Sequence, residues 1–259
     1  MTTVAGGLGT TTAGSLDATG VNAGFNGLQG LCLDPTGTWL GVVDSQNHKI
    51  RKMMLGSYVV TTYAGCAGAC AAYAVGTPPG PLIDGVGTNA KFAYPLHCGF
   101  DPLGNMYVSE FSNPATGSKI RRIAPGGVVS TLAGNGTVGS SDGTGTNALF
   151  SSIRGIVVEP TGTYLYAADY GYNVIKRVAL ATGVVTTLMG KAQTAYSSAT
   201  IDGTGTSATI AVPCGLAMDP NGMIFATDQN SNVSALARAQ AHAHVRVCAH
   251  THPDPRTLP

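Results

Sequence analysis

The sequence predicts an all-β fold built from repeated units of four antiparallel strands, and two observations support this. Of the 259 residues, 36 are glycine and only 10% are charged. Glycine at about twice its usual share, without the every-third spacing of collagen, indicates many tight turns. The second observation is repetition: short β-branched and aromatic runs alternate with turn residues, and the same order recurs four times along the chain.

Each repeat is expected to hold its strands in the same order. The first repeat has an Asp-Pro-x-Gly turn at Asp34, followed by runs at Trp39–Asp44, Lys49–Lys52 and Val59–Gly65. Four short strands per repeat are the signature of a β-propeller blade. We place the blades at about residues 27–65, 96–134, 153–190 and 214–233, the last together with residues 1–7.

The ends of the chain bear on ring closure. Thr2–Gly6 matches the outer strand of the other repeats, and the fourth repeat lacks that strand. We therefore expect residues 1–7 to complete the fourth blade and close a four-bladed ring; the alternatives are a fragment of a six-bladed ring and an open edge filled by another chain. The propeller is placed at residues 1–233, and 234–259 is predicted to be an Ala/His-rich tail foreign to the fold. Glycine ends at Gly222, and the tail alternates with period two, which predicts a strand.

These motifs resemble those of the NHL-repeat family over about residues 1–233. The matching elements are the Asp-Pro-x-Gly turn, the Ile-Arg-Lys strand, Val-x-Thr-Leu-Ala-Gly, and an Asp-Gly-x-Gly-Thr-x-Ala joint between blades at Asp84, Asp142 and Asp202. The resemblance implies a non-catalytic scaffold that binds a protein or another ligand through its joints and channel mouth. Related propellers that act as lactonases or lyases imply the alternative, an enzyme with an axial divalent cation.

Twelve of the thirteen acidic residues recur in three repeat columns: Asp17, Asp84, Asp142 and Asp202; Asp34, Asp101, Glu159 and Asp219; Asp44, Glu110, Asp169 and Asp228. A catalytic carboxylate normally breaks a repeat, because acid and base roles must differ at one place. We therefore predict turn-forming acids, no catalytic carboxylate and no cofactor. The alternative is a carboxylate ring that binds Ca²⁺ on the axis.

Eight of the fourteen basic residues lie on the third strand of blades one to three: Lys49, Arg51, Lys52, Lys119, Arg121, Arg122, Lys176 and Arg177. Because side chains alternate along a strand, Ile50, Ile120 and Ile175 are expected to pack inward while their basic neighbours form solvated cross-strand pairs. A net charge of +1 argues against a nucleic-acid partner. A protein partner or self-association is expected instead.

Binding residues are sought where the repeat fails. The innermost strand of each blade is expected to begin at the channel, with Gln29, Leu96, Arg154 and Cys214 in one column and glycine in the next, where the second blade has His97. We predict a contact site at the channel mouth from Gln29, His97, Arg154 and Cys214. A metal site is not predicted, because no Cys-x-x-Cys pair occurs.

The long joint from Cys66 to Ile83 is the second candidate, since insertions in propellers often carry binding. Its expected contacts are Cys66, Cys70, Pro78 and Pro79, and a Cys66–Cys70 disulfide forms there if the compartment is oxidising. Low charge and two glycosylation sequons, at Asn135 and Asn232, weakly favour an extracellular glycoprotein. The sequence contains no run of 18 apolar residues, so it predicts no membrane span.

Overall fold

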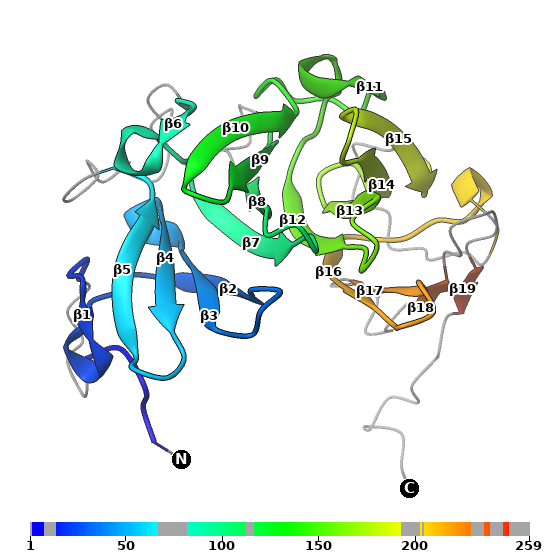
Figure 1. Cartoon of the computed structure of the whole chain (residues 1–259). Coiled ribbons are helices and arrows are strands. Elements are labelled where there is room, and N and C mark those ends of the chain that lie inside the picture. Colours follow the sequence, from blue (N-terminus) through cyan, green and yellow to red (C-terminus); the bar gives the residue numbers. More distant parts are fainter. Residues whose placement is uncertain are drawn as a thin grey trace, which may run out of the picture.

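The computed structural model describes residues 2–7, 14–66, 82–111, 117–192, 203, 205–228, 236–238 and 246–248. The fold is all-β, with antiparallel sheets placed side by side around an arc (Figure 1). Three sheets have five strands each, and two further sheets have two strands each within the described residues. We call the first four sheets, each with the joint that precedes it, blades 1 to 4.

The strands of the blades follow one pattern. Blade 1 contains β1 (Ala18–Thr19), β2 (Leu28–Leu33), β3 (Trp39–Asp44), β4 (Lys49–Met54) and β5 (Val59–Ala64). Blade 2 contains β6 (Gly85–Val86), β7 (Pro95–Phe100), β8 (Met106–Glu110), β9 (Lys119–Ala124) and β10 (Val128–Ala133). Blade 3 contains β11 (Gly143–Thr144), β12 (Ile153–Val158), β13 (Tyr164–Asp169), β14 (Val174–Ala179) and β15 (Val184–Met189). Blade 4 contains β16 (Pro213–Met218) and β17 (Ile224–Asp228).

The four longer strands of blades 1 to 3 form the meander that the repeat predicts. The sequence did not predict the fifth strand, a two-residue piece of the joint that pairs with the outer edge, as in Ala18 opposite Val60. Short 3₁₀ turns complete the joints and one hairpin: η1 (Gly20–Asn22), η2 (Ser45–Asn47), η3 (Gly87–Asn89), η4 (Gly145–Asn147) and η5 (Gly205–Ser207).

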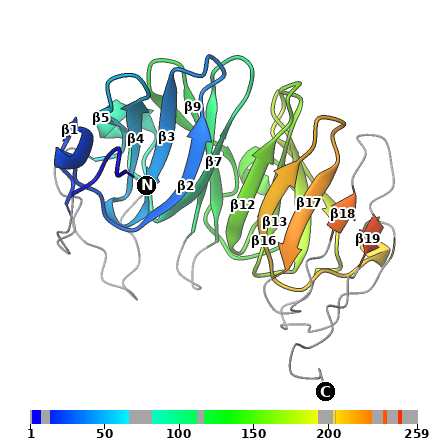
Figure 2. The same cartoon turned by 90° about the horizontal axis from the view of Figure 1, so that it is seen from below.

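The hydrophobic core lies between blades rather than inside one of them. The inner strands β2, β7, β12 and β16 lie next to one another along the arc (Figure 2). Three apolar clusters fill the junctions, around Ile50 and Phe92 between blades 1 and 2, Ile120 and Ile153 between blades 2 and 3, and Ile175 and Ile224 between blades 3 and 4. The inward packing expected of Ile50, Ile120 and Ile175 is confirmed.

The two ends of the chain lie at opposite ends of the arc. Residues 2–7 lie against blade 1, where the Gly6 N–H donates to the Gly20 carbonyl at 3.2 Å. The completion of blade 4 by this segment, and the number of blades in a ring, stay predictions. In the tail, β18 (Leu236–Arg238) and β19 (Arg246–Cys248) pair antiparallel, which agrees with its strand-like alternation.

The first-corner acids form the turns expected of them, with one exception. The Asp34 carboxylate accepts backbone N–H bonds from Thr36, Thr38 and Trp39, and Asp101 and Asp219 do the same in their own corners. Glu159 accepts hydroxyl groups instead, from Thr161 in its own corner at 3.1 Å and from Tyr166 on the next strand at 2.6 Å. Asp101 likewise accepts the Tyr107 hydroxyl at 3.0 Å, so this link to the next strand does not depend on the longer side chain of glutamate.

Candidate functional site

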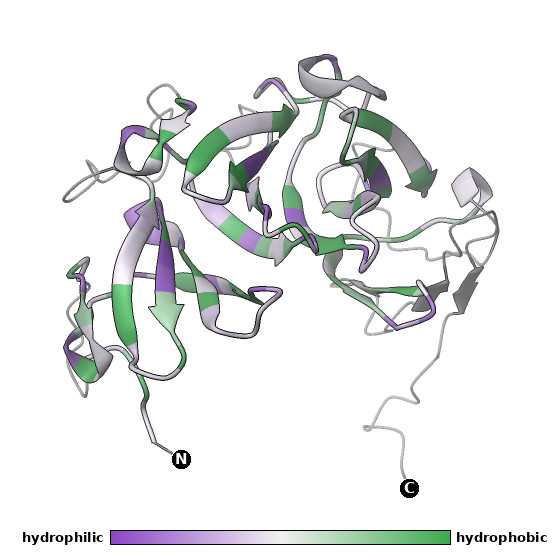
Figure 3. Ribbon diagram, in the orientation of Figure 1, coloured by the Kyte–Doolittle hydropathy of each residue, from purple (hydrophilic) through white to green (hydrophobic). Residues whose placement is uncertain are grey.

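A buried cation joins each of blades 1 to 3 to its joint. In blade 1, the Arg51 guanidinium lies 2.8 Å from the Asp44 carboxylate and 2.7 Å from that of Asp17. Blade 2 repeats this with Arg121 between Glu110 and Asp84, and in blade 3 Lys176 pairs with Asp142. The three cationic side chains are fully buried, and Figure 3 shows polar segments on β4, β9 and β14 where they lie. The expectation of solvated pairs is therefore wrong for this column.

We call each of these buried cations, together with its acidic partners, a brace. The braces also hold the joints against the outer strands. The Asp142 carboxylate accepts the backbone N–H and the hydroxyl of Thr187, and Asp17 and Asp84 bind Thr62 and Thr131 in the same way. The other acidic column binds residues far along the chain, as when Asp44 accepts the Asn26 N–H. In the described part of the chain both columns thus make long-range links rather than local turns, which corrects the turn prediction there; Asp202 and the side chain of Asp228 lie outside the described residues.

Replacing Asp142 by asparagine is expected to destabilise the protein in a pH-dependent way. Burial raises the pKa of Asp142, but the Lys176 ammonium and the Thr187 donors outweigh it and hold that pKa below the usual value. The carboxylate therefore stabilises the fold above its unfolded pKa of about 3.9, and this contribution is lost as the pH falls through the folded pKa.

Because the Asp142 side chain is 45% exposed, we expect a loss of about 1 kcal/mol or less in the free energy of unfolding at pH 7. Urea unfolding of both proteins from pH 7 to pH 3 would measure it. A difference that does not shrink as the pH falls would contradict this role.

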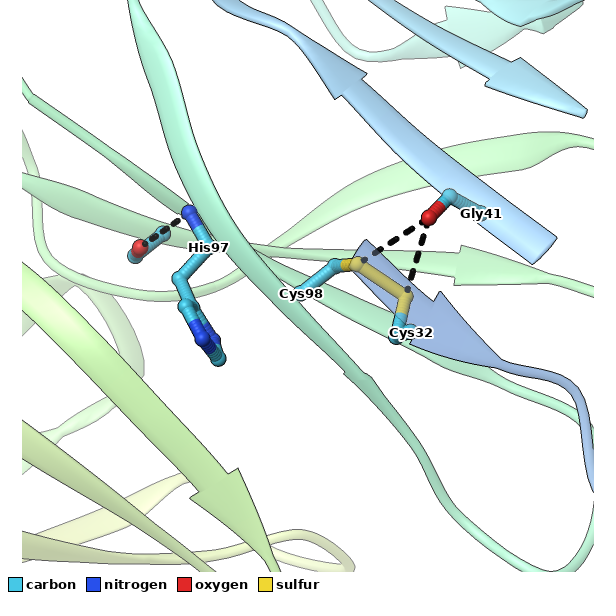
Figure 4. The surroundings of a disulfide bond; sticks show 5 residues. Cys32, Gly41, His97 and Cys98 are labelled. Atoms are coloured by element: carbon cyan, nitrogen blue, oxygen red, sulfur yellow. Dashed lines mark hydrogen bonds between the residues drawn. A yellow bond between two sulfur atoms is a disulfide. The ribbon is translucent and has the colours of Figure 1, made fainter. Parts of the chain in front are cut away.

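The predicted channel-mouth residues lie on the four adjacent inner strands β2, β7, β12 and β16, each with its own contacts. The His97 backbone N–H donates to Ser109 Oγ at 3.2 Å, and its ring Nδ1 is buried without a hydrogen-bond partner among the described residues (Figure 4). Burial lowers the pKa of His97, which favours the neutral ring at neutral pH. Arg154 stacks on Tyr170 at 3.8 Å from the ring centre. A joint site formed by these residues stays a prediction.

The other predicted positions are placed only in part. Gln29 is exposed on β2, and the thiol of Cys214 donates to the Val212 carbonyl at 3.5 Å. Cys66 is disulfide-bonded, whereas Cys70, Pro78, Pro79 and Asn232 lie outside the described residues. Asn135 is exposed, with its Oδ1 accepting the Thr137 N–H at 2.8 Å, and its glycosylation stays a prediction.

Neither metal binding nor membrane insertion gains structural support. Within the part of the chain that the structure describes, no three His, Cys, Asp or Glu side chains lie close enough together to hold an ion. In the same residues, no helix is both long and apolar enough to cross a bilayer.

A disulfide that the sequence did not predict joins the inner strands of two blades. Cys32 on β2 and Cys98 on β7 have Cα atoms 5.7 Å apart and are separated by 66 positions in the sequence (Figure 4). Both sulfur atoms lie 3.8 Å from the Gly41 carbonyl oxygen, which the figure marks by dashed lines. The tight fit needs glycine at position 41, because a Cβ there would lie 2.9 Å from the Cys32 sulfur and 2.3 Å from Met106 Cε.

An aromatic pocket lies beside this disulfide, where blades 1 and 2 meet. Its volume is about 460 Å³, within the range usual for ligand sites. The rings of Tyr63 and Phe100 pack against Trp39 with centroids 5.2 and 5.0 Å away, the second edge-on. The Lys52 ammonium lies 4.7 Å from the centre of the Trp39 ring. The rim is supplied by corner residues, including Pro35, Pro102, Leu103 and Pro125.

The pocket is a place where the repeat fails. The position of Trp39 is occupied by Asn105, Tyr164 and Met223 in the other blades, that of Tyr63 by Leu132 and Leu188, and that of Phe100 by Leu33, Val158 and Met218. The sequence therefore carried a signal for this pocket. The signal is divided among three columns whose residues contact one another only where two blades pack.

The comparisons with known proteins agree with the repeat. No family model matches the chain. NHL repeat-containing protein 2 of Bos taurus is 31% identical over 175 residues, 63% of this chain, and that of Homo sapiens is 31% identical over 178 residues, 64% of it. These two matches support an NHL-repeat family for the chain. The chain spans 22% of the length of either relative.

Solved structures share the fold of this chain. A structural genomics protein of unknown function from Bacteroides thetaiotaomicron superposes with a TM-score of 0.60 at 21% identity, over 87% of this chain and 48% of that one. An auxiliary nutrient binding protein from Bacteroides ovatus gives 0.59 at 14% identity, over 88% and 50%. Streptogramin B lyase gives 0.54 at 11% identity, over 90% and 56%. At these identities the likeness shows a propeller-like fold and nothing more.

Proposed function

We propose that this chain is a non-catalytic interaction module whose aromatic pocket binds an extended, proline-containing segment of a partner protein. The observation that carries the proposal is the packing of Trp39, Tyr63 and Phe100 at one blade junction, at positions where the other blades have mostly smaller side chains. The acids that recur elsewhere in the chain are engaged in corners and braces, so the pocket is the feature that departs most from the repeat.

The chemistry of the pocket suits such a segment. Proline-rich segments adopt a preformed extended helix and dock on grooves lined by aromatic side chains, which keeps the entropy cost of binding low. The Tyr63 hydroxyl donates to the Ala124 carbonyl of blade 2 at 3.3 Å, which ties the floor to both blades. The Lys52 ammonium at the edge of Trp39 provides a charge that can pair with an acidic residue beside the prolines of the segment.

Titration with a ten-residue oligoproline tests the proposal directly. Trp39 is the only tryptophan of the chain, so ligand in the pocket is expected to give a saturable change in tryptophan fluorescence. A peptide of alternating glycine and serine is the control ligand. Calorimetry then compares variants, and Trp39→Ala is expected to cost about 2 kcal/mol, roughly a thirtyfold rise in Kd, as usual for a central aromatic anchor.

Two matched variants make the result specific. Tyr164 occupies the position of Trp39 in blade 3 and stacks with Arg177, so Tyr164→Ala should leave oligoproline binding unchanged. His97→Ala is the matched control at the channel mouth, and it should also leave oligoproline binding unchanged. Binding that depends on His97 and not on Trp39 would overturn the pocket proposal in favour of a channel-mouth site, and no saturable binding of oligoproline would overturn the ligand class.

A further inference from the structure

Blade 1 exposes apolar side chains on its inner strand, at positions that are buried or half-buried in the later blades. On β2, the side chains of Leu31 and Leu33 are 60% and 54% exposed. Cys98 in blade 2 and Ile156 in blade 3 occupy the same position in the strand pairing as Leu31 in blade 1. Their side chains are only 3% and 1% exposed. Since their neighbours in the sheet are equivalent, the difference comes from the preceding blade, which covers β7 and β12 but not β2 in the described structure.

Leu31 pairs with Val42, which belongs to an apolar cluster of blade 1 that is itself buried. Val42, Met53 and Val60 are at most 7% exposed, and they are flanked by Leu40 and Phe25. A hollow of about 550 Å³ lies on blade 1 beside Ala5, Phe25 and Leu28. Leu31, Leu33 and this hollow form the docking surface of blade 1.

The position of residues 2–7 shows what this surface is shaped to receive. At each later junction, the glycine that ends the outer strand of one blade donates its N–H to the 3₁₀ turn of the next joint: Gly65 to Gly87, Gly134 to Gly145 and Gly190 to Gly205. Gly6 donates to Gly20 in the same way and shares their positive φ. Thr2–Gly6 thus lies where the outer strand of a blade before blade 1 would end.

We propose that the docking surface on blade 1 binds blade 4 of a second copy of this chain. Blade 4 stands at the other end of the arc (Figure 1), and among the described residues it is the blade behind which no other blade packs. The contact places β16 and β17 of one copy against the docking surface of the other, in the position that the preceding blade holds at the junctions within the chain. In a two-fold dimer each copy supplies one blade 1 and one blade 4, so the contact forms twice.

Light scattering after size-exclusion chromatography tests this with the full chain. The expected mass is twice 26.2 kDa, with dissociation on dilution. The double variant Leu31→Asp and Leu33→Asp is expected to be monomeric. The control Val128→Asp, at a valine that is 47% exposed on the outer strand β10 of blade 2, is expected to remain dimeric. A monomeric wild-type chain, or a dimer that survives the double substitution, would overturn the proposal.

Hydrogen exchange of the unaltered chain provides a measurement that does not depend on how the variant folds. Amide protection of residues 28–33 is expected to rise with protein concentration, together with that of residues 213–228. Protection of 28–33 that is the same at every concentration in a monomer would overturn the second copy in favour of closure within one chain. Protection of 28–33 without 213–228 would overturn the choice of blade 4.

Discussion

Replacing Arg121 by methionine is expected to lower the free energy of unfolding by about 3–5 kcal/mol at neutral pH. The guanidinium contacts both oxygens of Glu110 at 3.2 Å and the Asp84 carboxylate at 2.6 Å. Its removal leaves Glu110, 1% exposed, without a counter-charge in a low-dielectric interior. Methionine keeps much of the apolar stem, so the loss reports the charge rather than a cavity. Chemical denaturation measures it.

The adjacent residue is the control. Arg122 points to the other face of β9, where it is half-buried and donates to Asn105 Oδ1 at 2.8 and 3.1 Å. Arg122→Met is expected to cost about 1 kcal/mol or less. Burial raises the pKa of Glu110, and loss of Arg121 raises it further. The cost of Arg121→Met should therefore shrink as the pH falls and Glu110 takes up a proton; equal losses in the two variants at every pH would contradict the brace.

Substituting both Cys32 and Cys98 by serine is expected to cost about 4 kcal/mol. The disulfide closes a loop of 66 residues between two blades, and a loop of this length restricts the unfolded chain by about that amount. Oxidised wild-type and variant proteins are compared by denaturant unfolding without reductant, because Cys66 is also disulfide-bonded. Cys214→Ser, at a cysteine that does not take part in this disulfide, serves as the control and should be neutral. Equal stability of wild type and double variant would show that the bond is absent in solution.

The repeat predicted most of the fold because its strands are local. Period-two alternation and the Asp-Pro-x-Gly corners predicted β2 to β5 and their counterparts in blades 2 and 3. The corner acids Asp34, Asp101 and Asp219 bind backbone groups of their own turns, within five residues along the chain. The two-residue strand β1 was missed, since its partner β5 lies some forty residues away and its composition of alanine and threonine carries no strand signal of its own.

The failures concern contacts between segments far apart in the chain. Arg51 was expected in solvent because basic residues seldom lie inside without partners, but its partner Asp17 comes from a joint 34 residues earlier. The Cys32–Cys98 bond was not predicted because these two cysteines meet only when two blades pack; the predicted Cys66–Cys70 bond stays a prediction, since Cys70 lies outside the described residues. Trp39 and Phe100 likewise meet only across a junction. The pocket could therefore be predicted only by knowing which blades are neighbours in space.

The separation of the core into junction clusters has a thermodynamic consequence. Each blade contacts only its immediate neighbours. The free energy of unfolding is therefore approximately a sum of the free energies of the single blades and of the interfaces between them, and unfolding need not be all-or-none. Covalent linkage at Cys32–Cys98 strengthens one coupling in that line, between blades 1 and 2. In the described structure blade 4 packs against another blade on one side only, so we expect it to unfold first. The aromatic pocket lies between blades 1 and 2, which we expect to unfold last.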